Sequence, residues 1–267
     1  MDVSEVVAAH YGSGDLTSAI LRALDEAGVD TTRLAVGDLG ALDQLHAGFA
    51  AATRVVLEHL GVVEGTRLLD VGCGLGGASR MAAHEFGAIV TGFDLTPQFV
   101  AAATELTARM GLADRVELQV APGDHLPLAD GSRDAAMMIH VGMNLPDKRA
   151  VFAEVRRVLR PGGIFAVYDQ MRVGPGALTF PQPWADGVGS SFVESPDQYA
   201  EHLAAAGFTV LATVDRTPEV LGPPPPSAGG LTPAVVLGRG FVDRLRNTEA
   251  DIAKGRLGAV LVTARVE

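Results

Sequence analysis

The stretch that most constrains this chain is residues 64–80, in which an apolar run, a cluster of glycines and a helical pattern follow one another directly. Residues 67–71 are typical of a buried parallel strand, because a short apolar run ends there at a glycine. The next element contains Gly72, Gly74, Gly76 and Gly77, which permit positive φ angles and let bare backbone approach a ligand. From Ala78 the apolar spacing becomes helical and stops at Gly87. The stretch therefore predicts a strand, a glycine turn and a helix N-terminus, an arrangement that binds nucleotides.

The glycine spacing is compatible with two cofactors, NAD and S-adenosylmethionine. Gly72, Gly74 and Gly77 satisfy the dinucleotide fingerprint, and Asp94 lies about 20 residues further on, where an NAD-binding acid is expected. Asp70 favours a different ligand, because a carboxylate beside a pyrophosphate is repelled, whereas beside a cation it is attracted. S-Adenosylmethionine (SAM) carries a sulfonium and an ammonium and no phosphate. The residues therefore favour SAM, and an NAD-dependent oxidoreductase stays open as an alternative.

Composition excludes some partners. The formal net charge is -11 and no basic patch is visible in the sequence, whereas binding to nucleic-acid phosphates requires such a patch. The single cysteine, Cys73, excludes an internal disulfide and favours a reducing compartment. Neither a long apolar span nor a cleavable signal pattern is found at the N-terminus. We expect a cytoplasmic protein with a small-molecule partner, no nucleic acid and no membrane span, as a monomer or a homodimer.

Helical and strand-like patterns alternate after residue 60, which predicts a mostly parallel sheet with right-handed crossovers. Strands are expected at 67–71, 88–93, 115–120, 134–139, 164–168, 208–215 and 257–264. Helices are expected at 97–110, 147–159, 196–206 and 234–254, and before the sheet at 4–11, 16–27 and 43–60. We expect a helical cap or lid at 1–60 and a core at 61–267, with lid insertions near 170–195 and 216–254, all in one folded unit.

Several short motifs occur in a family-like order. They are Leu-Leu-Asp-Val-Gly-Cys-Gly-Leu-Gly-Gly at 68–77, Asp94-Leu-Thr-Pro, Gly123-Asp124 and Arg160-Pro161-Gly162-Gly163. Together they resemble the class I SAM-dependent methyltransferases over about residues 64–169. Tyr11 and Gln44-Leu45-His46 in the N-terminal segment are similar to the small-molecule subgroup of the UbiE and type 11 kind.

The resemblance implies an α/β fold and an activity. The fold is a Rossmann-like, seven-stranded, mostly parallel sheet with an antiparallel last strand, helices on both faces and a helical N-terminal cap. The activity is transfer of a methyl group from SAM to oxygen, nitrogen or carbon of a small-molecule acceptor, in secondary metabolism, with S-adenosylhomocysteine as the product. A relative repurposed for cyclisation or binding is a further alternative, because a working and an empty binding motif have the same sequence.

Family roles follow for residues at the nucleoside end of SAM. The resemblance implies that Asp94 accepts both ribose hydroxyls, with Leu95 and Gln98 beside it. It also implies that Asp124 accepts from the adenine amino group and that His125 contributes its backbone. A solvated loop acid or a helix N-cap is the local alternative for Asp94.

The methionine end of SAM is expected at the glycine turn. Asp70 and the backbone of Gly72 and Gly74 would serve it, and Gln44 and His140 are further cofactor candidates. A turn acid that caps nearby N–H groups is the local alternative for Asp70, and both of its roles can hold together.

Acceptor residues are expected after the fourth strand. His140 lies at the strand end where open α/β sheets bind ligands, and an imidazole there can remove the acceptor's proton. Some relatives pair such a histidine with a lid tyrosine, which here is Tyr11. His140 has two alternative roles, a cofactor contact and a hydrogen bond to a loop carbonyl. His46, Tyr168 and Trp184 are the expected acceptor-binding residues, although His46 also suits a helix surface and Trp184 a loop anchor.

A metal site is not expected. The seven histidines contain no closely spaced pair, and the chain has one cysteine. Structural zinc sites use clusters of such ligands at short spacing.

Overall fold

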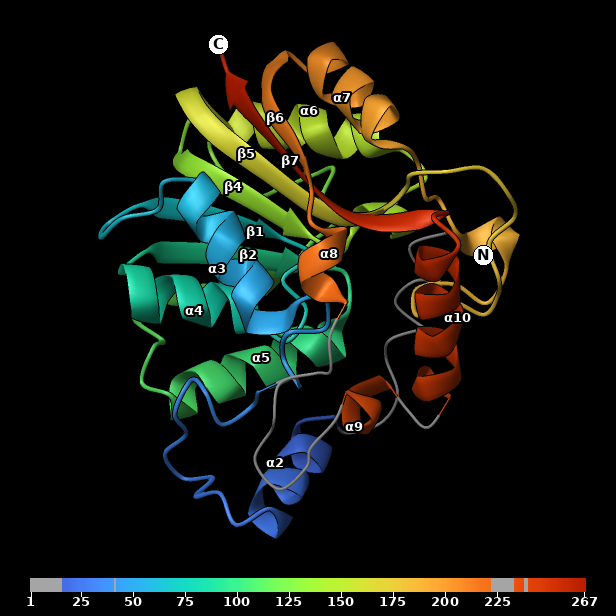
Figure 1. Ribbon diagram of the computed structural model, residues 1–267. Helices are drawn as coiled ribbons and strands as arrows, with labels where there is room; N and C mark the ends of the chain where they lie inside the picture. The colour runs from blue at the N-terminus through green and yellow to red at the C-terminus, as the bar shows by residue number, and fades with distance from the viewer. Residues whose placement is uncertain (1–15, 41, 222–232, 238–239) are drawn as a thin grey trace.

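The computed structural model describes residues 16–40, 42–221, 233–237 and 240–267. Its centre is a seven-stranded sheet with the order β3-β2-β1-β4-β5-β7-β6 (Figure 1). The strands are β1 (Arg67–Val71), β2 (Ile89–Asp94), β3 (Val116–Val120), β4 (Arg133–Ile139), β5 (Leu159–Arg172), β6 (Phe208–Asp215) and β7 (Leu257–Val266). Strand β7 runs antiparallel between β5 and β6, and the other pairings are parallel. The predicted Rossmann-like sheet with an antiparallel last strand is confirmed.

Helices cover both faces of the sheet, because successive strand residues point to opposite sides. In β1, Leu68 packs in the layer of α3 (Phe49–His59) and α4 (Gly77–Phe86). Its neighbour Leu69 packs in the layer of α6 (Lys148–Val158) and α7 (Pro196–Ala205). Helix α5 (Pro97–Arg109) packs against β2, β3 and α2 (Leu16–Glu26). The two layers leave the carboxyl ends of β1, β2 and β4 together at one edge (Figure 1).

The segment before β1 differs from the prediction in one place. The helix expected at 16–27 is present as α2, but the helix expected from residue 43 begins at Phe49. Gly48 and Phe49 have φ angles of 78° and 48°, which end helical geometry on their N-terminal side. Residues 43–48 pass over the glycine turn instead, where a Cβ at Gly77 would overlap the Asp43 carbonyl. The predicted start at residue 43 is wrong, and the cap boundary at residue 60 stays a prediction.

The last third of the chain departs from the expected bounds in two elements. Strand β5 spans Leu159–Arg172 rather than 164–168. Pairing with β4 extends its start across an irregularity between Arg133 and Ala135, and pairing with β7 extends its end to Arg172. The helix expected at 234–254 is divided into α9 (Ala234–Leu237) and α10 (Phe241–Ala253). A short helix, α8 (Thr217–Val220), lies between β6 and α9 in the chain. The helix expected at 4–11 and the proline run at 223–226 lie outside the described residues.

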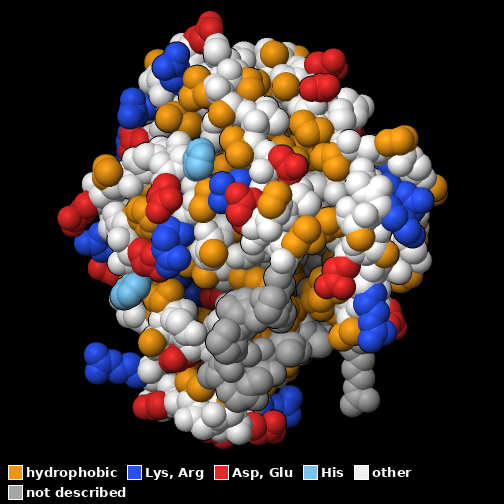
Figure 2. Space-filling model, in the orientation of Figure 1, with side chains coloured by type: hydrophobic (Ala, Val, Ile, Leu, Met, Phe, Trp, Pro, Cys, Tyr) orange, Lys and Arg blue, Asp and Glu red, His pale blue; other side chains and the backbone are white. Residues whose placement is uncertain are grey.

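The surface carries charges of both signs. On the face in Figure 2, Lys and Arg side chains lie among acidic and apolar side chains rather than in one broad patch. In the part of the chain that the structure describes, none of the helices has both the length and the apolar character needed to span a bilayer.

Candidate active site

The glycine turn after β1 forms one wall of a cleft. Gly72 has a φ of 74°, and a Cβ there would overlap Val141, so the glycine lets the loop after β4 come close. Gly74 has a φ of 52° and borders open space. The N–H groups of Gly72 and Cys73 donate to the Phe93 carbonyl at 2.7 and 3.0 Å, which ties the turn to the end of β2. Bare backbone thus faces the cleft.

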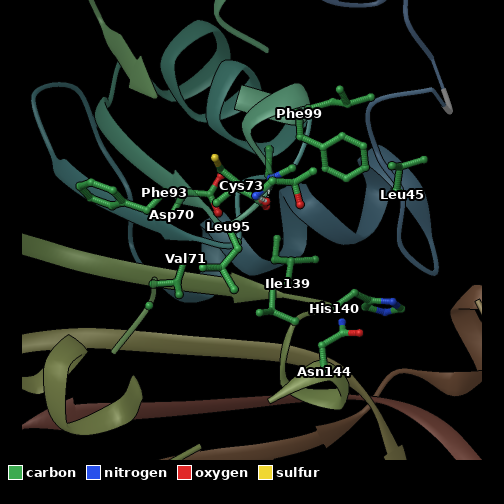
Figure 3. A pocket seen from close by; sticks show the side chains of 18 of the residues that line it. Leu45, Asp70, Val71, Cys73, Phe93, Leu95, Phe99, Ile139, His140 and Asn144 are labelled. Carbon is green, nitrogen blue, oxygen red and sulfur yellow. Dashed lines mark hydrogen bonds between the residues drawn. The ribbon is translucent and has the colours of Figure 1, made fainter. Parts of the chain in front are cut away.

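The cleft lies at the carboxyl ends of β1, β2 and β4 and has a volume of about 1220 Å³, its open mouth included (Figure 3). Open α/β sheets bind ligands at this position. Its walls are the glycine turn, the loops after β2 and β4, and part of the N-terminal segment. The predicted site residues that line it are His46, Asp70, Gly72, Gly74, Asp94, Leu95 and His140.

Two acidic side chains lie at the base of the glycine turn. Asp70 is buried and its Oδ2 accepts from the Ser79 hydroxyl at 2.6 Å. Asp94 accepts from the N–H groups of Gly74 at 2.9 Å and Thr96 at 2.8 Å. Asp94 thus ties the turn together, but it is not the helix N-cap that was its alternative, because the N-cap of α5 is Thr96. Asp70 is held by a hydroxyl rather than by N–H groups. Both carboxylates also line the cleft.

The electrostatics of these two acids favour a cationic ligand. Burial raises the pKa of Asp70 to about 7, and the nearby Asp94 adds to the rise. Burial also raises the pKa of Asp94, although its two N–H donors oppose this. Among the described residues, neither carboxylate has a salt-bridge partner. A buried and a half-buried acid without a described countercharge fit a sulfonium and an ammonium, and they oppose a pyrophosphate.

SAM binding is expected to be about tenfold weaker at pH 6 than at pH 8 because of Asp70. The pKa of this carboxyl is about 7 in the free protein, and a bound cation lowers it. Binding at pH 6 therefore has to release a proton that is already absent at pH 8. Isothermal titration calorimetry at both pH values measures the difference, and Asp70→Asn is the control that removes it. If SAM affinity changed equally between pH 6 and pH 8 in the wild type and in Asp70→Asn, the role given to Asp70 would be contradicted.

The N-terminal segment reaches the cleft through Asp43, Leu45 and His46. Asp43 forms a buried salt bridge with Arg80 of α4 at 2.8 Å. The same guanidinium donates to the Leu75 carbonyl at 2.7 Å, so Arg80 holds the N-terminal segment and the glycine turn together.

Gln44 lies behind the cleft wall rather than in it. Its side chain is buried, and its Oε1 lies 2.9 Å from Nε2 of His46. Oε1 also accepts from the Thr53 hydroxyl at 2.7 Å. Gln44 therefore orients His46, and direct contact of Gln44 with a cofactor stays a prediction.

His140 directly follows β4 in a conformation that is uncommon for a histidine, with a φ of 54°. Its N–H donates to the Tyr168 carbonyl at 2.8 Å. The ring centroid lies 5.4 Å from that of Tyr168 and 5.8 Å from that of His46. Burial, with a smaller effect of His46, holds the pKa of His140 well below its usual value. Burial also lowers the pKa of His46 to about 4, so both imidazoles are neutral at pH 7.

Two of the predicted acceptor residues lie beside or behind the cleft. The Tyr168 ring adjoins the two histidines, and its hydroxyl donates to the Ala47 carbonyl at 3.1 Å. Trp184 is buried, packs with Met143 and donates to the Ser191 hydroxyl at 3.0 Å. Trp184 thus anchors its loop, as its alternative role predicted, and it does not line the cleft.

The remaining predicted residues are those expected to bind the nucleoside end of SAM, together with Tyr11. Gln98, Asp124 and His125 are exposed and do not line the cleft, whereas Gly123 does. Their roles stay predictions. Tyr11 lies outside the described residues.

Some cleft residues were not predicted from the sequence. Asp43 and Arg80 pair across 37 positions, and no local pattern indicates such a pair. Asn144 lines the cleft from the short 3-10 turn Gly142–Asn144, and its place just after His140 at a strand end is the signal that could have identified it. Within the described ranges there is no cluster of three or more metal-ligating side chains.

Comparison with known proteins identifies the type of domain. Residues 69–167 match the family model of a methyltransferase domain. "Methyltransferase GfsG" of Streptomyces halstedii is 36% identical over 132 residues, which are 49% of this chain and 48% of that protein. The 2-methyl-6-phytyl-1,4-hydroquinone methyltransferase of Synechocystis sp. is 43% identical over 107 residues, 39% of this chain and 32% of that protein. The chain thus spans half or less of the length of these curated relatives.

A solved structure extends the likeness beyond the matched segment. It is a geranyl diphosphate methyltransferase in complex with SAM, 25% identical, with a TM-score of 0.66 over 81% of this chain and 85% of that chain. The matched segment 69–167 contains the glycine turn, both cleft carboxylates and His140. Motif order, sheet topology and these similarities agree: residues 69–167 are similar to the methyltransferase domain family, and the fold resembles that of SAM-dependent methyltransferases.

Proposed function

We propose that this protein transfers a methyl group from SAM to a small-molecule acceptor. The observation that carries the proposal is the pair of cleft carboxylates, buried Asp70 and half-buried Asp94, which lie beside bare glycine backbone without a described countercharge. SAM supplies an electrophilic methyl group on a sulfonium. Asp94 holds the ribose hydroxyls, and Asp70 with the turn at Gly72 and Gly74 holds the methionine end.

The protein's further contribution is alignment and exclusion of water. Residues 43–46 and the loop after β4 close the sides of the cleft. Where the acceptor atom is oxygen or nitrogen, the neutral imidazole of His140 takes its proton. His46 and Tyr168 pack against that imidazole and fix its place. A role in secondary metabolism rests on the subgroup resemblance.

Native mass spectrometry of the purified protein, with and without added SAM, tests the proposal. A complex with SAM or S-adenosylhomocysteine supports it. Retention of NAD instead, with no SAM complex, would support the oxidoreductase reading of the glycine turn. SAM binding without turnover on a broad acceptor panel would favour the alternative that this protein has been repurposed for cyclisation or binding.

His140→Ala is expected to slow methyl transfer to an oxygen or nitrogen acceptor by roughly 100-fold or more, the usual contribution of a general base. The affinity for SAM should change less than about twofold, because the imidazole acts on the acceptor rather than on SAM. Rates of S-adenosylhomocysteine release and calorimetric SAM titrations measure the two effects. His84→Ala, on the exposed side of α4, is the matched control. An equal loss of SAM affinity would make His140 a cofactor contact.

A further inference from the structure

Two buried polar atoms beside the cleft have no hydrogen-bond partner among the described residues. They are Nε2 of His140 and Oδ1 of Asn144, and both residues line the cleft. Figure 3 shows their side chains next to each other below Ile139, on the side away from Asp70 and Cys73. An unpaired buried polar atom costs about 1–3 kcal/mol. Two of them at one end of a cleft indicate groups that a ligand satisfies.

The turn that carries Asn144 is fixed from behind. The Asn144 N–H donates to the Val141 carbonyl at 2.9 Å. Gly142 packs so closely on Tyr199 and Asp169 that a Cβ would overlap both side chains. The Tyr199 hydroxyl in turn donates to Asp169 at 2.7 Å, and both side chains are buried. The turn is therefore held in one place, and a binding group on it is preorganised.

The charges around the cleft argue against an anionic acceptor. Its described lining contains three acids, Asp43, Asp70 and Asp94, and neither Lys nor Arg. Lys148 lies next to the loop, but its Nζ donates to the Phe192 carbonyl at 2.7 Å and lies 3.3 Å from Glu194. Phosphate groups on a ligand are bound by Arg or Lys, so an acceptor phosphate would find no free cation in this lining.

The sequence outside the described ranges adds little positive charge. Residues 1–15, Ala41 and residues 222–232 contain neither Lys nor Arg, and Arg239 is the single cation of the remaining two positions. The walls of the cleft include Leu45, Ile139 and Leu145. An uncharged molecule with an apolar body fits such walls.

We infer that the acceptor is uncharged and carries a hydroxyl group that Asn144 and His140 bind together, with Asn144 as a specificity-determining residue. This inference rests on the proposed function and names its substrate class. A hydroxyl donates one hydrogen bond and accepts others, so it can donate to the neutral His140 imidazole. Its oxygen then accepts from the NH2 group of the Asn144 carboxamide, which takes the place of Oδ1 after a half-turn of the terminal torsion.

Binding of three matched probes to the sinefungin complex tests the inference without turnover. Sinefungin is an unreactive SAM analogue in which a carbon that bears an amino group replaces the methylated sulfur. The probes are 1-naphthol, 1-naphthyl phosphate and naphthalene, which share one apolar body, and calorimetry at pH 7.5 compares their affinities. We expect 1-naphthol to bind about tenfold more tightly than naphthalene, as one or two hydrogen bonds imply. The phosphate should bind more weakly than 1-naphthol by at least a similar factor, because it meets carboxylates.

Two variants show whether Asn144 causes the preference. Asn144→Leu should reduce the 1-naphthol preference about fivefold or more while leaving sinefungin affinity unchanged. Met143→Leu is the matched control, since Met143 shares the turn but packs away from the cleft with Trp184. Retained sinefungin binding confirms that each variant is folded.

Several results would overturn the inference. Equal affinities of 1-naphthol and naphthalene, tighter binding of the phosphate, an unchanged preference in Asn144→Leu, or no binding of any probe would each contradict it. Only failure of sinefungin to bind the wild-type protein would contradict the proposed function itself, and the inference would fall with it.

Discussion

Replacing Asp94 with alanine is expected to weaken SAM binding by roughly 100-fold or more, because a charged acceptor of two ribose hydroxyls contributes about 1.5–3 kcal/mol per hydrogen bond. The variant also removes the acceptor for the Gly74 and Thr96 N–H groups, so the turn loses two of its ties. Calorimetric titration with SAM measures the loss.

The control for Asp94→Ala is a second variant that also removes one carboxylate, but at a position away from the cleft. Asp114 is exposed and precedes β3 at the amino edge of the sheet, away from the cleft. Asp114→Ala should leave SAM affinity within about twofold, because surface charges at this distance are screened by salt. Unchanged SAM affinity in Asp94→Ala would remove Asp94 from the ribose site.

Replacing Arg80 with methionine is expected to lower the free energy of unfolding by about 3–5 kcal/mol, the usual cost of removing one partner of a buried ion pair. Arg80 is fully buried, and its loss leaves the Asp43 carboxylate and the Leu75 carbonyl without their donor. SAM affinity should fall as well, since Arg80 joins the N-terminal segment to the glycine turn. Chemical denaturation followed by circular dichroism measures the first effect, and calorimetry the second.

A double variant separates the charge from the shape of this pair. Arg80→Met combined with Asp43→Leu should be more stable than Arg80→Met alone, because the unpaired buried carboxylate is gone. Arg54→Ala breaks the more exposed ion pair with Glu85 and should cost less than about 1 kcal/mol. A loss of similar size in Arg54→Ala and Arg80→Met would contradict the role given to the buried pair.

The elements that could be predicted closely have local signals. The expected strands at 67–71 and 208–215 coincide with β1 and β6. An apolar run ended by Gly72, and an alternating run that begins after Gly207, define those bounds without reference to the rest of the chain. The helix expected from residue 43 failed because its start depends on a distant group. Asp43 forms its salt bridge with Arg80. The positive φ angles of Gly48 and Phe49 then separate the segment that contains Asp43 from α3.

The same distinction holds for the site, where residues placed by local signals were predicted and residues placed by distant contacts were not. Asp70, Asp94 and His140 each stand at or just after a strand end, so the expected topology already places them at one edge of the sheet. Asn144 lines the cleft because of a turn whose position depends on Tyr199 and Asp169, which are remote in the sequence. Trp184 has no strand to position it, and its anchoring role follows from packing with Met143.

Strand β7 lies between β5 and β6, although it is the last strand in chain order. Ile164 of β5 pairs with Arg265, and Phe208 of β6 with Val266, so both pairings join distant parts of the chain. Pairings of this kind form late. On the ribosome, β5 and β6 therefore expose unpaired backbone until residues 257–266 emerge. The growing chain is most open to aggregation, and most in need of chaperones, in the interval between the synthesis of β6 and that of β7.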